Sequence, residues 1–144
     1  MYRLLATDID DTILAEDGSL PEANQRALES LHRRGIPVVF SSGRATVSVR
    51  ALARRIIPLA DDEYIIGFNG ARVVTAQSER VLFQQLLPPE VLREVTAYAR
   101  EQSLLVQGYD AEAFVVESDD PRYKEYAADT GMEYRVVESI ADAL

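Results

Sequence analysis

The segment best suited to chemistry follows a short apolar run near the start of the chain and reads Asp8-Ile9-Asp10-Asp11-Thr12. Side chains two apart on an extended chain point to the same side, so Asp8 and Asp10 face a common space. Two convergent carboxylates repel each other unless a cation lies between them, and oxygen ligands favour a hard ion such as Mg²⁺. With a phosphate ester beside that ion, one carboxylate can attack phosphorus while the other protonates the leaving oxygen.

An acidic run alone is more often a solvated loop, or a helix cap made by Asp10 or Asp11. Two further segments change this balance. Ser41-Ser42-Gly43-Arg44 combines hydroxyls, accessible backbone and a guanidinium, which suit phosphate oxygens, although a serine there can also be an N-cap. Asn69-Gly70 follows the next apolar run and is also a common turn. Together, three polar segments that each follow a predicted strand indicate a phosphate site.

Apolar runs and helical patterns alternate through the first half of the chain. Strands are predicted at residues 3–9, 36–40 and 64–68, with a return strand at 72–75 and helices at 21–34 and 45–58. This order predicts an α/β fold with a Rossmann-like parallel sheet. Ligands bind at the carboxyl ends of the strands in such sheets, which is where the polar segments fall.

The pattern changes after about residue 80, which predicts a first domain over 1–80 and a second α/β module over 81–144. In the second module, strands are predicted at 81–87, 104–108 and 113–117, helices at 88–102 and 121–130, and a further helix near the last residue. A hairpin turn is expected at 108–110, and five aromatic residues are expected to pack in this module: Tyr98, Tyr109, Phe114, Tyr123 and Tyr126.

Composition narrows the function classes. The net charge of −9 and the pI near 4.6 argue against nucleic-acid binding, because an acidic chain repels phosphate backbones. The absence of cysteine excludes disulfides, thiolate catalysis and cysteine-ligated zinc. The apolar run at the start is too short for a signal sequence, and no stretch is long enough to span a bilayer. We therefore expect a cytoplasmic protein without a membrane partner.

The motifs resemble those of the haloacid dehalogenase superfamily, in particular the Cof-like sugar-phosphate phosphatases with a large type IIB α/β cap. The family's Asp-x-Asp-x-Thr motif is matched by Asp8, Asp10 and Thr12. Its second motif is matched by Ser42-Gly43-Arg44, and its Asn-Gly-Ala turn by Asn69-Gly70-Ala71. The resemblance covers essentially the whole chain and implies that residues 81–144 are the first part of the cap.

The resemblance also implies roles for these residues. Asp8 would be the nucleophile that forms an aspartyl-phosphate, and Asp10 the general acid and then the base. Asp8 and Asp10, the latter through its backbone carbonyl, would bind Mg²⁺, and the substrate would be a small phosphorylated metabolite such as a sugar phosphate. Phosphate or substrate contacts are implied for Thr12, Ser42, Gly43, Arg44 and Asn69.

Three departures from the family pattern stand out. Asp11 occupies a position that is usually glycine. The family's lysine and its later acidic metal ligands have no counterpart, because the single lysine, Lys124, falls in a predicted cap helix and Asp61-Asp62 precedes the third strand. We therefore expect a chain truncated after the first half, with weak activity or none alone, that self-associates or needs a complementing chain.

Other functions remain open at this stage. The main alternative is a non-catalytic remnant that binds phosphate, metal or a protein partner. A two-component receiver domain would carry an acid after the third strand, where this chain has Phe68-Asn69-Gly70. A dinucleotide-binding domain would carry a glycine-rich fingerprint after the first strand, which is absent. His32 is expected on the solvent side of the first helix, and the basic stretch from Arg50 to Arg55 on a solvated helix face.

Overall fold

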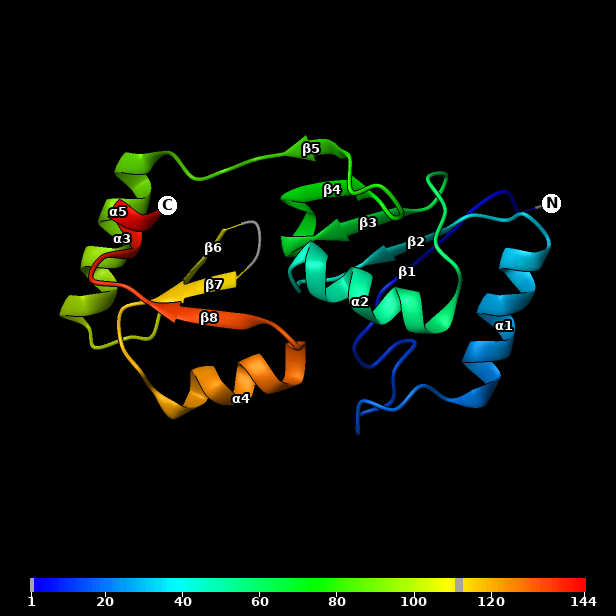
Figure 1. Cartoon of the computed structure of the whole chain (residues 1–144), viewed down its shortest axis with the longest axis horizontal. Helices are drawn as coiled ribbons and strands as arrows, with labels where there is room; N and C mark the ends of the chain where they lie inside the picture. Colours follow the sequence, from blue (N-terminus) through cyan, green and yellow to red (C-terminus); the bar gives the residue numbers. More distant parts are fainter. Residues whose placement is uncertain (1, 111–112) are drawn as a thin grey trace. The chain divides into compact units, whose positions relative to one another are not determined.

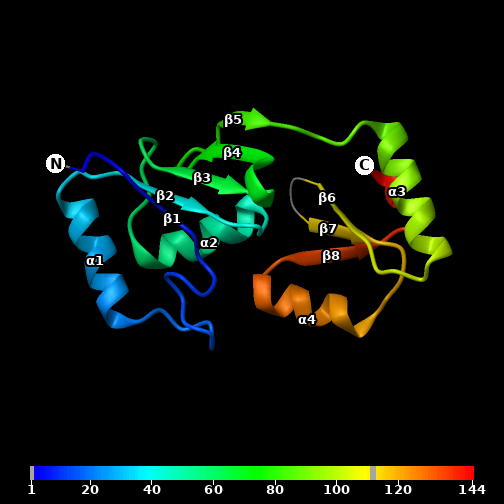
Figure 2. The same ribbon diagram turned by 180° about the vertical axis from the view of Figure 1, so that it is seen from behind.

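The computed structural model describes residues 2–110 and 113–144 and divides the chain into two compact units, residues 1–85 and 86–144. Figure 1 and Figure 2 show the elements of each unit from opposite sides. Among the described residues, no helix combines the length and apolar character that crossing a membrane requires.

Unit 1 is built on a sheet with the strand order β1-β2-β3-β4-β5. The first three strands run parallel, and the last two join antiparallel. Its elements are β1 (Leu5–Thr7), α1 (Glu22–Arg33), β2 (Val38–Ser41), α2 (Thr46–Ile56), β3 (Tyr64–Gly67), the short 3-10 helix η1 (Phe68–Gly70), β4 (Arg72–Thr75) and β5 (Val81–Gln84). The predicted β-α-β-α-β order and the antiparallel return strand are therefore confirmed.

The helices of unit 1 start and stop where local chemistry directs. Pro21 precedes the first residue of α1, and Gly35, with φ +63°, follows its end in a left-handed conformation that glycine adopts readily. The α1 and α2 helices contact each other and lie on one face of the sheet (Figure 1). The buried core beneath them includes Ile9, Leu28, Val38, Phe40, Val49 and Ile65.

The strand predicted at 81–87 belongs to the first unit, which moves the boundary from residue 80 to residue 85. β5 pairs antiparallel with β4, and the amide of Gln85 donates to the carbonyl of Ala71 at 2.9 Å. A tight connection directs the chain back, since the amide of Thr75 donates to the carbonyl of Arg80 at 3.0 Å. The change of sequence pattern near residue 80 thus coincides with the turn between β4 and β5, and not with the end of the unit.

Unit 2 is a smaller α/β module with the strand order β6-β7-β8. β6 and β7 are antiparallel, and β7 and β8 are parallel. Its elements are α3 (Pro89–Glu101), β6 (Gln107–Tyr109), β7 (Ala113–Val116), α4 (Pro121–Thr130), β8 (Glu133–Val136) and α5 (Ile140–Ala143). The turn predicted at 108–110 is wrong for Gly108 and Tyr109, which lie inside β6. Residues 111–112 lie outside the described ranges. β8 had not been predicted.

An aromatic cluster fills one side of the unit 2 sheet. Phe114 is fully buried, and four tyrosine rings lie with their centroids 5.3–6.3 Å from its own: Tyr109, Tyr123, Tyr126 and Tyr134. The expected packing role is wrong for Tyr98, which is 60% exposed on α3. That position falls on the outer surface of the helix, whereas Thr96 and Ala99 of α3 are buried.

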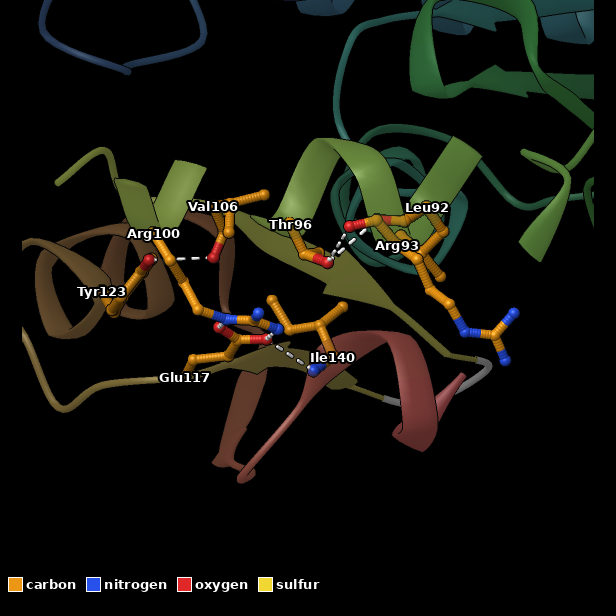
Figure 3. Close-up of polar contacts among 8 residues, drawn as sticks. All are labelled: Leu92, Arg93, Thr96, Arg100, Val106, Glu117, Tyr123 and Ile140. Carbon is orange, nitrogen blue, oxygen red and sulfur yellow. Dashed lines mark hydrogen bonds and ion pairs between the residues drawn. The ribbon is translucent and has the colours of Figure 1, made fainter. Parts of the chain in front are cut away.

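A polar cluster joins α3, β7 and α5 (Figure 3). Arg100 donates from Nε to Glu117 Oε2 at 2.6 Å and from Nη2 to Glu117 Oε1 at 3.0 Å. Glu117 Oε1 also accepts the backbone amide of Ile140 at 2.8 Å, which satisfies an N–H at the start of α5. The same view shows Thr96 bonding back to the carbonyl of Leu92, so its hydroxyl is satisfied within α3.

Candidate active site

The candidate site lies at the carboxyl edge of the parallel strands in unit 1. Asp8 directly follows β1, Ser42 directly follows β2, and Asn69 follows β3 within η1. Thr7 is in register with Phe40, and Ser41 with Ile66, so the ends of these strands meet at one edge. Parallel pairing therefore gathers residues that are more than 60 positions apart in the sequence.

The loop after β1 folds back onto Ile9. The Ile9 carbonyl accepts backbone N–H groups from Thr12, Ile13 and Leu14 at 3.3, 3.0 and 3.0 Å, and the Ile9 side chain is fully buried. Asp8 and Asp10 are exposed on either side of it. The alternation expected from the sequence is therefore present, with one apolar residue anchoring the loop and two carboxylates facing solvent.

Thr12 contacts the first carboxylate directly. Its Oγ1 donates to Asp8 Oδ2 at 3.4 Å, a long hydrogen bond between two exposed side chains. Asp8 Oδ1 accepts no hydrogen bond from the described part of the chain, and Asp8 takes part in no ion pair there. The predicted nucleophile thus has one oxygen without a hydrogen-bond partner in the described ranges. Thr12, which was predicted to contact phosphate, instead restrains the Asp8 carboxylate.

Asp11 adopts the left-handed conformation, with φ 56°. A side chain with a β-carbon is disfavoured there, although aspartate tolerates this region better than most residues. The departure from glycine noted in the sequence therefore leaves the loop in a conformation that glycine would occupy without strain.

Arg44 reaches back to the loop after β1 and pairs with Asp10. Its Nε donates to Asp10 Oδ2 at 2.9 Å, and its Nη2 donates to Asp10 Oδ1 at 2.7 Å. This is the two-pronged arrangement that a planar guanidinium makes with a carboxylate. The guanidinium predicted to contact phosphate therefore contacts the predicted acid-base residue across 34 positions of sequence.

Ser42 is 5% exposed and is held by both neighbouring segments. Its amide donates to the carbonyl of Ile66 at 2.9 Å, its carbonyl accepts the amide of Asn69 at 3.3 Å, and its Oγ accepts the amide of Arg44 at 3.1 Å. Because Oγ acts as an acceptor in that contact, its own hydrogen remains available to an anion. Ser42 also caps its own loop, so the structural and functional interpretations are compatible.

Gly43 and Asn69 lie against each other beside Ser42. A β-carbon on Gly43 would approach Asn69 Oδ1 to 3.1 Å, so the amide side chain lies close to the exposed backbone of Gly43. Asn69 has φ 53°, a conformation in which asparagine is enriched. The Asn69-Gly70 turn thus positions an amide at the rim of the site.

Gly67 is a structural determinant of the site that the sequence analysis missed. A β-carbon there would lie 2.7 Å from Thr46 Cγ2, 2.9 Å from the Thr46 amide nitrogen and 3.0 Å from the Arg44 carbonyl oxygen. Two of these atoms belong to the backbone and cannot rotate away. A glycine inside a strand marks a close backbone approach, and that signal was present in Tyr64–Gly67.

The donor chemistry at this edge suits Mg²⁺, but the described residues supply only part of a complete ligand set. Asp8 Oδ1 and the carbonyl oxygen of Asp10 accept no hydrogen bond within the described ranges, so both are available as hard oxygen ligands. No group of three or more His, Cys, Asp or Glu side chains that could hold a metal occurs among these residues. Lys124 lies in α4 of unit 2 and pairs with Asp119 at 3.1 Å.

The family model for haloacid dehalogenase-like hydrolases matches residues 5–142, which is nearly the entire chain and includes all of the motifs above. The chain belongs to this family. The family assignment agrees with the fold expected from the sequence, an α/β core with a parallel sheet followed by a second α/β module.

Relatives of this haloacid dehalogenase-like chain include phosphatases. It is 32% identical over 138 residues to the HMP-PP phosphatase of Cronobacter sakazakii, covering 96% of this chain and 49% of that protein. It is 25% identical to a putative phosphatase of Haemophilus influenzae, covering 95% of this chain and 50% of that protein. The chain thus spans about half the length of the curated relatives it matches.

Solved structures support the fold of the haloacid dehalogenase-like chain. A haloacid dehalogenase-like hydrolase from Bacteroides thetaiotaomicron matches with a TM-score of 0.87 and 25% identity, over 100% of this chain and 55% of that one. A Thermotoga maritima structure matches with a TM-score of 0.81 and 29% identity, over 99% of this chain and 52% of that one. A subclass IIB sugar phosphatase matches with a TM-score of 0.72 and 19% identity, over 93% of this chain and 52% of that one, and supports the fold alone.

Proposed function

We propose that this chain carries the nucleophile and the acid-base residue of a Mg²⁺-dependent phosphohydrolase acting on small phosphorylated metabolites. The observation that carries the proposal is the Asp8 carboxylate at the carboxyl end of β1, whose Oδ1 accepts no hydrogen bond from the described residues, together with the oriented carboxylate of Asp10. Unit 1 then corresponds to the first part of the catalytic core, and unit 2 to part of the α/β cap. Family membership supports both assignments.

The chemistry assigned to these residues takes two steps. Asp8 Oδ1 attacks phosphorus, the bond to the leaving oxygen breaks, and Asp10 gives that oxygen a proton. Asp10 then takes a proton from water as that water attacks the aspartyl-phosphate, which releases orthophosphate and restores Asp8. The Ser42 hydroxyl and the backbone beside Gly43 hold phosphate oxygens during both steps. Bound Mg²⁺, held by Asp8 and the carbonyl of Asp10, would neutralise charge on the phosphate.

The substrate class is assigned from relatives and not from a described pocket. The 32% identical relative is an HMP-PP phosphatase, an enzyme named for a small phosphorylated molecule. We extend that class, and no single metabolite, to this chain. The net charge of −9 favours a small phosphorylated ligand, whose charge a local cation can neutralise. It disfavours a long polyanion such as nucleic acid, which the whole chain repels.

The 144-residue chain alone is proposed to be a weak catalyst, because its single lysine, Lys124, is paired with Asp119 within unit 2. Removing one preorganised electrostatic contact typically costs roughly 3–4 kcal/mol of transition-state stabilisation. The same observation favours the second candidate function, a non-catalytic module that binds phosphate or metal. The two candidates differ in whether Asp8 can accept a phosphoryl group.

Beryllofluoride labelling separates these two candidates, because this probe mimics a phosphoryl group on an aspartate. We expect one equivalent to bind in the presence of Mg²⁺, detected by ¹⁹F NMR and native mass spectrometry. Asp8→Asn should abolish labelling, and Asp62→Asn, an exposed aspartate before β3, is the matched control that should retain it. Labelling that is absent in the parent chain, or that survives in Asp8→Asn, would refute the catalytic assignment.

A further inference from the structure

We propose that Arg44 is a positioning residue that holds the Asp10 carboxylate in one orientation, and not a ligand of the substrate phosphate. This inference rests on the proposed function and adds a mechanism for orienting the acid-base residue. It also changes the assignment made from sequence, in which Arg44 was grouped with the phosphate contacts.

The contact itself has the geometry of an orienting device. The bonds of 2.9 and 2.7 Å use both oxygens of Asp10, so the plane of the carboxylate is fixed as well as its position. The Asp10 side chain is 48% exposed, and the loop that carries it is anchored mainly through Ile9. Without a second contact, such an exposed side chain would sample several rotamers.

Arg44 is held firmly enough to serve this role. Its amide donates to Ser42 Oγ at 3.1 Å, and its carbonyl accepts the amide of Phe68 at 2.9 Å. The absence of a β-carbon at Gly67 allows β3 to approach that carbonyl closely. The arginine side chain is only 26% exposed, against 48% for its partner. The loops after β2 and β3 thus hold the backbone of Arg44, from which its side chain reaches the more exposed Asp10.

A residue held in this way would matter most when the leaving oxygen needs a proton. An alkyl phosphate releases a basic alkoxide and depends on a correctly oriented acid, whereas p-nitrophenolate leaves without one. A phosphate ligand would instead affect both esters alike, and would be needed to bind orthophosphate. Leaving-group dependence therefore distinguishes the two roles of Arg44.

The first test measures the orientation of Asp10 in the chain itself, without turnover. Three-bond ¹³C and ¹⁵N couplings should report one χ1 rotamer for Asp10 in the parent chain and averaged rotamers in Arg44→Gln. Asp10 should also show averaged rotamers in Arg44→Lys, because an ammonium keeps the charge but lacks the planar pair of donors of a guanidinium. Arg26→Gln on α1 is the matched control, since it removes an exposed arginine from the same unit. Equal rotamer populations in the parent and Arg44→Gln would overturn the proposal.

The second test titrates orthophosphate with Mg²⁺ into the same variants and follows the amides of Ser42 and Gly43. We expect Arg44→Gln to change the dissociation constant by less than about 3-fold. A loss of more than about 10-fold would make Arg44 a phosphate ligand and overturn the proposal. If the parent chain binds no orthophosphate, the proposed function fails, while the rotamer measurement still decides the role of Arg44.

The third test measures turnover by the 144-residue chain with Mg²⁺, and the Asp8→Asn variant provides the blank. Arg44→Gln should lower kcat on an alkyl phosphate by roughly 10- to 100-fold, within the range of general acid catalysis, and leave KM within about 3-fold. On p-nitrophenyl phosphate the rate of the first step, measured as the initial burst of p-nitrophenolate, should fall by less than about 3-fold, whereas the second step needs Asp10 as base for both esters. Adding Arg44→Gln to Asp10→Asn should cause little further loss, because both changes remove one function. Equal losses in the rate of the first step on both esters would contradict a positioning role.

Discussion

At the scale of single residues, Asp11 is held in an unfavourable conformation next to the site. Its φ of 56° lies in the left-handed region, between the proposed acid-base residue and the threonine that contacts Asp8. Its immediate neighbours along the chain are Asp10 and Thr12. The unfavourable free energy of this backbone conformation has to be offset by other contacts. The hydrogen bonds to the Ile9 carbonyl are such contacts.

Replacing Asp11 should therefore separate backbone strain from side-chain chemistry. We expect Asp11→Ala to lower the free energy of unfolding by roughly 0.5–1 kcal/mol, because alanine tolerates positive φ less well than aspartate. Asp11→Gly should be neutral or slightly stabilising, since relief of strain offsets the extra freedom of the unfolded chain. Urea denaturation followed by circular dichroism measures both. An Asp11→Ala variant as stable as Asp11→Gly would show that this φ is not maintained in solution.

Two residues expected on solvated surfaces form specific contacts instead. His32 Nδ1 lies 3.2 Å from Glu63 Oε1. The Glu63 side chain is 2% exposed, and its Oε2 accepts the Ala60 amide at 3.0 Å. Arg50 donates to the carbonyls of Ala76 and Gln77 at 2.9 and 2.6 Å. A helical periodicity cannot reveal these partners, because each lies at least 26 positions away in sequence.

At the scale of elements, the approach of β3 to the start of α2 positions the site. Gly67 lies within reach of the Thr46 amide and the Arg44 carbonyl, so one residue without a side chain lets strand, loop and helix meet. The Ser42, Arg44 and Phe68 hydrogen bonds depend on that approach. Stability and site geometry are therefore coupled at Gly67.

Gly67→Ala should destabilise unit 1 by about 1–3 kcal/mol, the usual cost of overpacking a rigid interior. Gly43→Ala is the matched control, because its nearest neighbour is the side chain of Asn69, which can shift at little cost. Thermal unfolding should show a clearly lower midpoint for Gly67→Ala only. Similar midpoints for the two variants would show that β3 and α2 separate easily.

At the scale of the whole molecule, both α-helices that the described part of unit 1 contains pack on one face of its sheet, and neither covers the other face. The register places a row of apolar side chains on the face opposite Phe40 and Ile65. These residues are Ala6, Val39, Tyr64, Ile66, Val73 and Phe83, and all except the buried Val39 are at least partly exposed. We name this row the open face.

We propose that the open face drives self-association of the chain. Light scattering coupled to size exclusion should report a mass that rises above 16.0 kDa as concentration increases. Ile66→Thr should shift the equilibrium toward monomer, and Val47→Thr, at an exposed position of α2, is the matched control. A concentration-independent monomer would refute this proposal.

Acid should destabilise the protein through carboxylates that are paired in the folded state. The hydrogen bond from Arg100 lowers the pKa of Glu117, that from Tyr134 lowers the pKa of Asp119, and that from Arg122 lowers the pKa of Asp120 to about 2. Since the folded values lie below the ordinary 4.5 and 3.8, this stability is complete above those values and is lost as pH falls toward about 2.

The thermal midpoint should thus stay nearly constant from about pH 7 to 5 and fall steeply between about pH 4.5 and 2. Glu117→Gln should lower the midpoint at neutral pH and flatten the acid limb, because Arg100 loses its charged partner. Glu94→Gln, on an exposed position of α3, serves as the matched control. Parallel acid limbs in both variants would show that the Glu117 pair contributes nothing to the pH dependence.

The local pattern of the sequence was sufficient for the elements and for the candidate site at the ends of β1, β2 and β3. Short apolar runs and helical spacing predict the order of strands and helices, and parallel pairing then places Asp8, Ser42 and Asn69 at one edge. Only the tertiary structure decided that Arg44 pairs with Asp10, that β5 joins the first unit, and that Gly67 admits α2. These outcomes depend on distances between segments far apart in the chain, and periodicity and turn chemistry report only on neighbours along it.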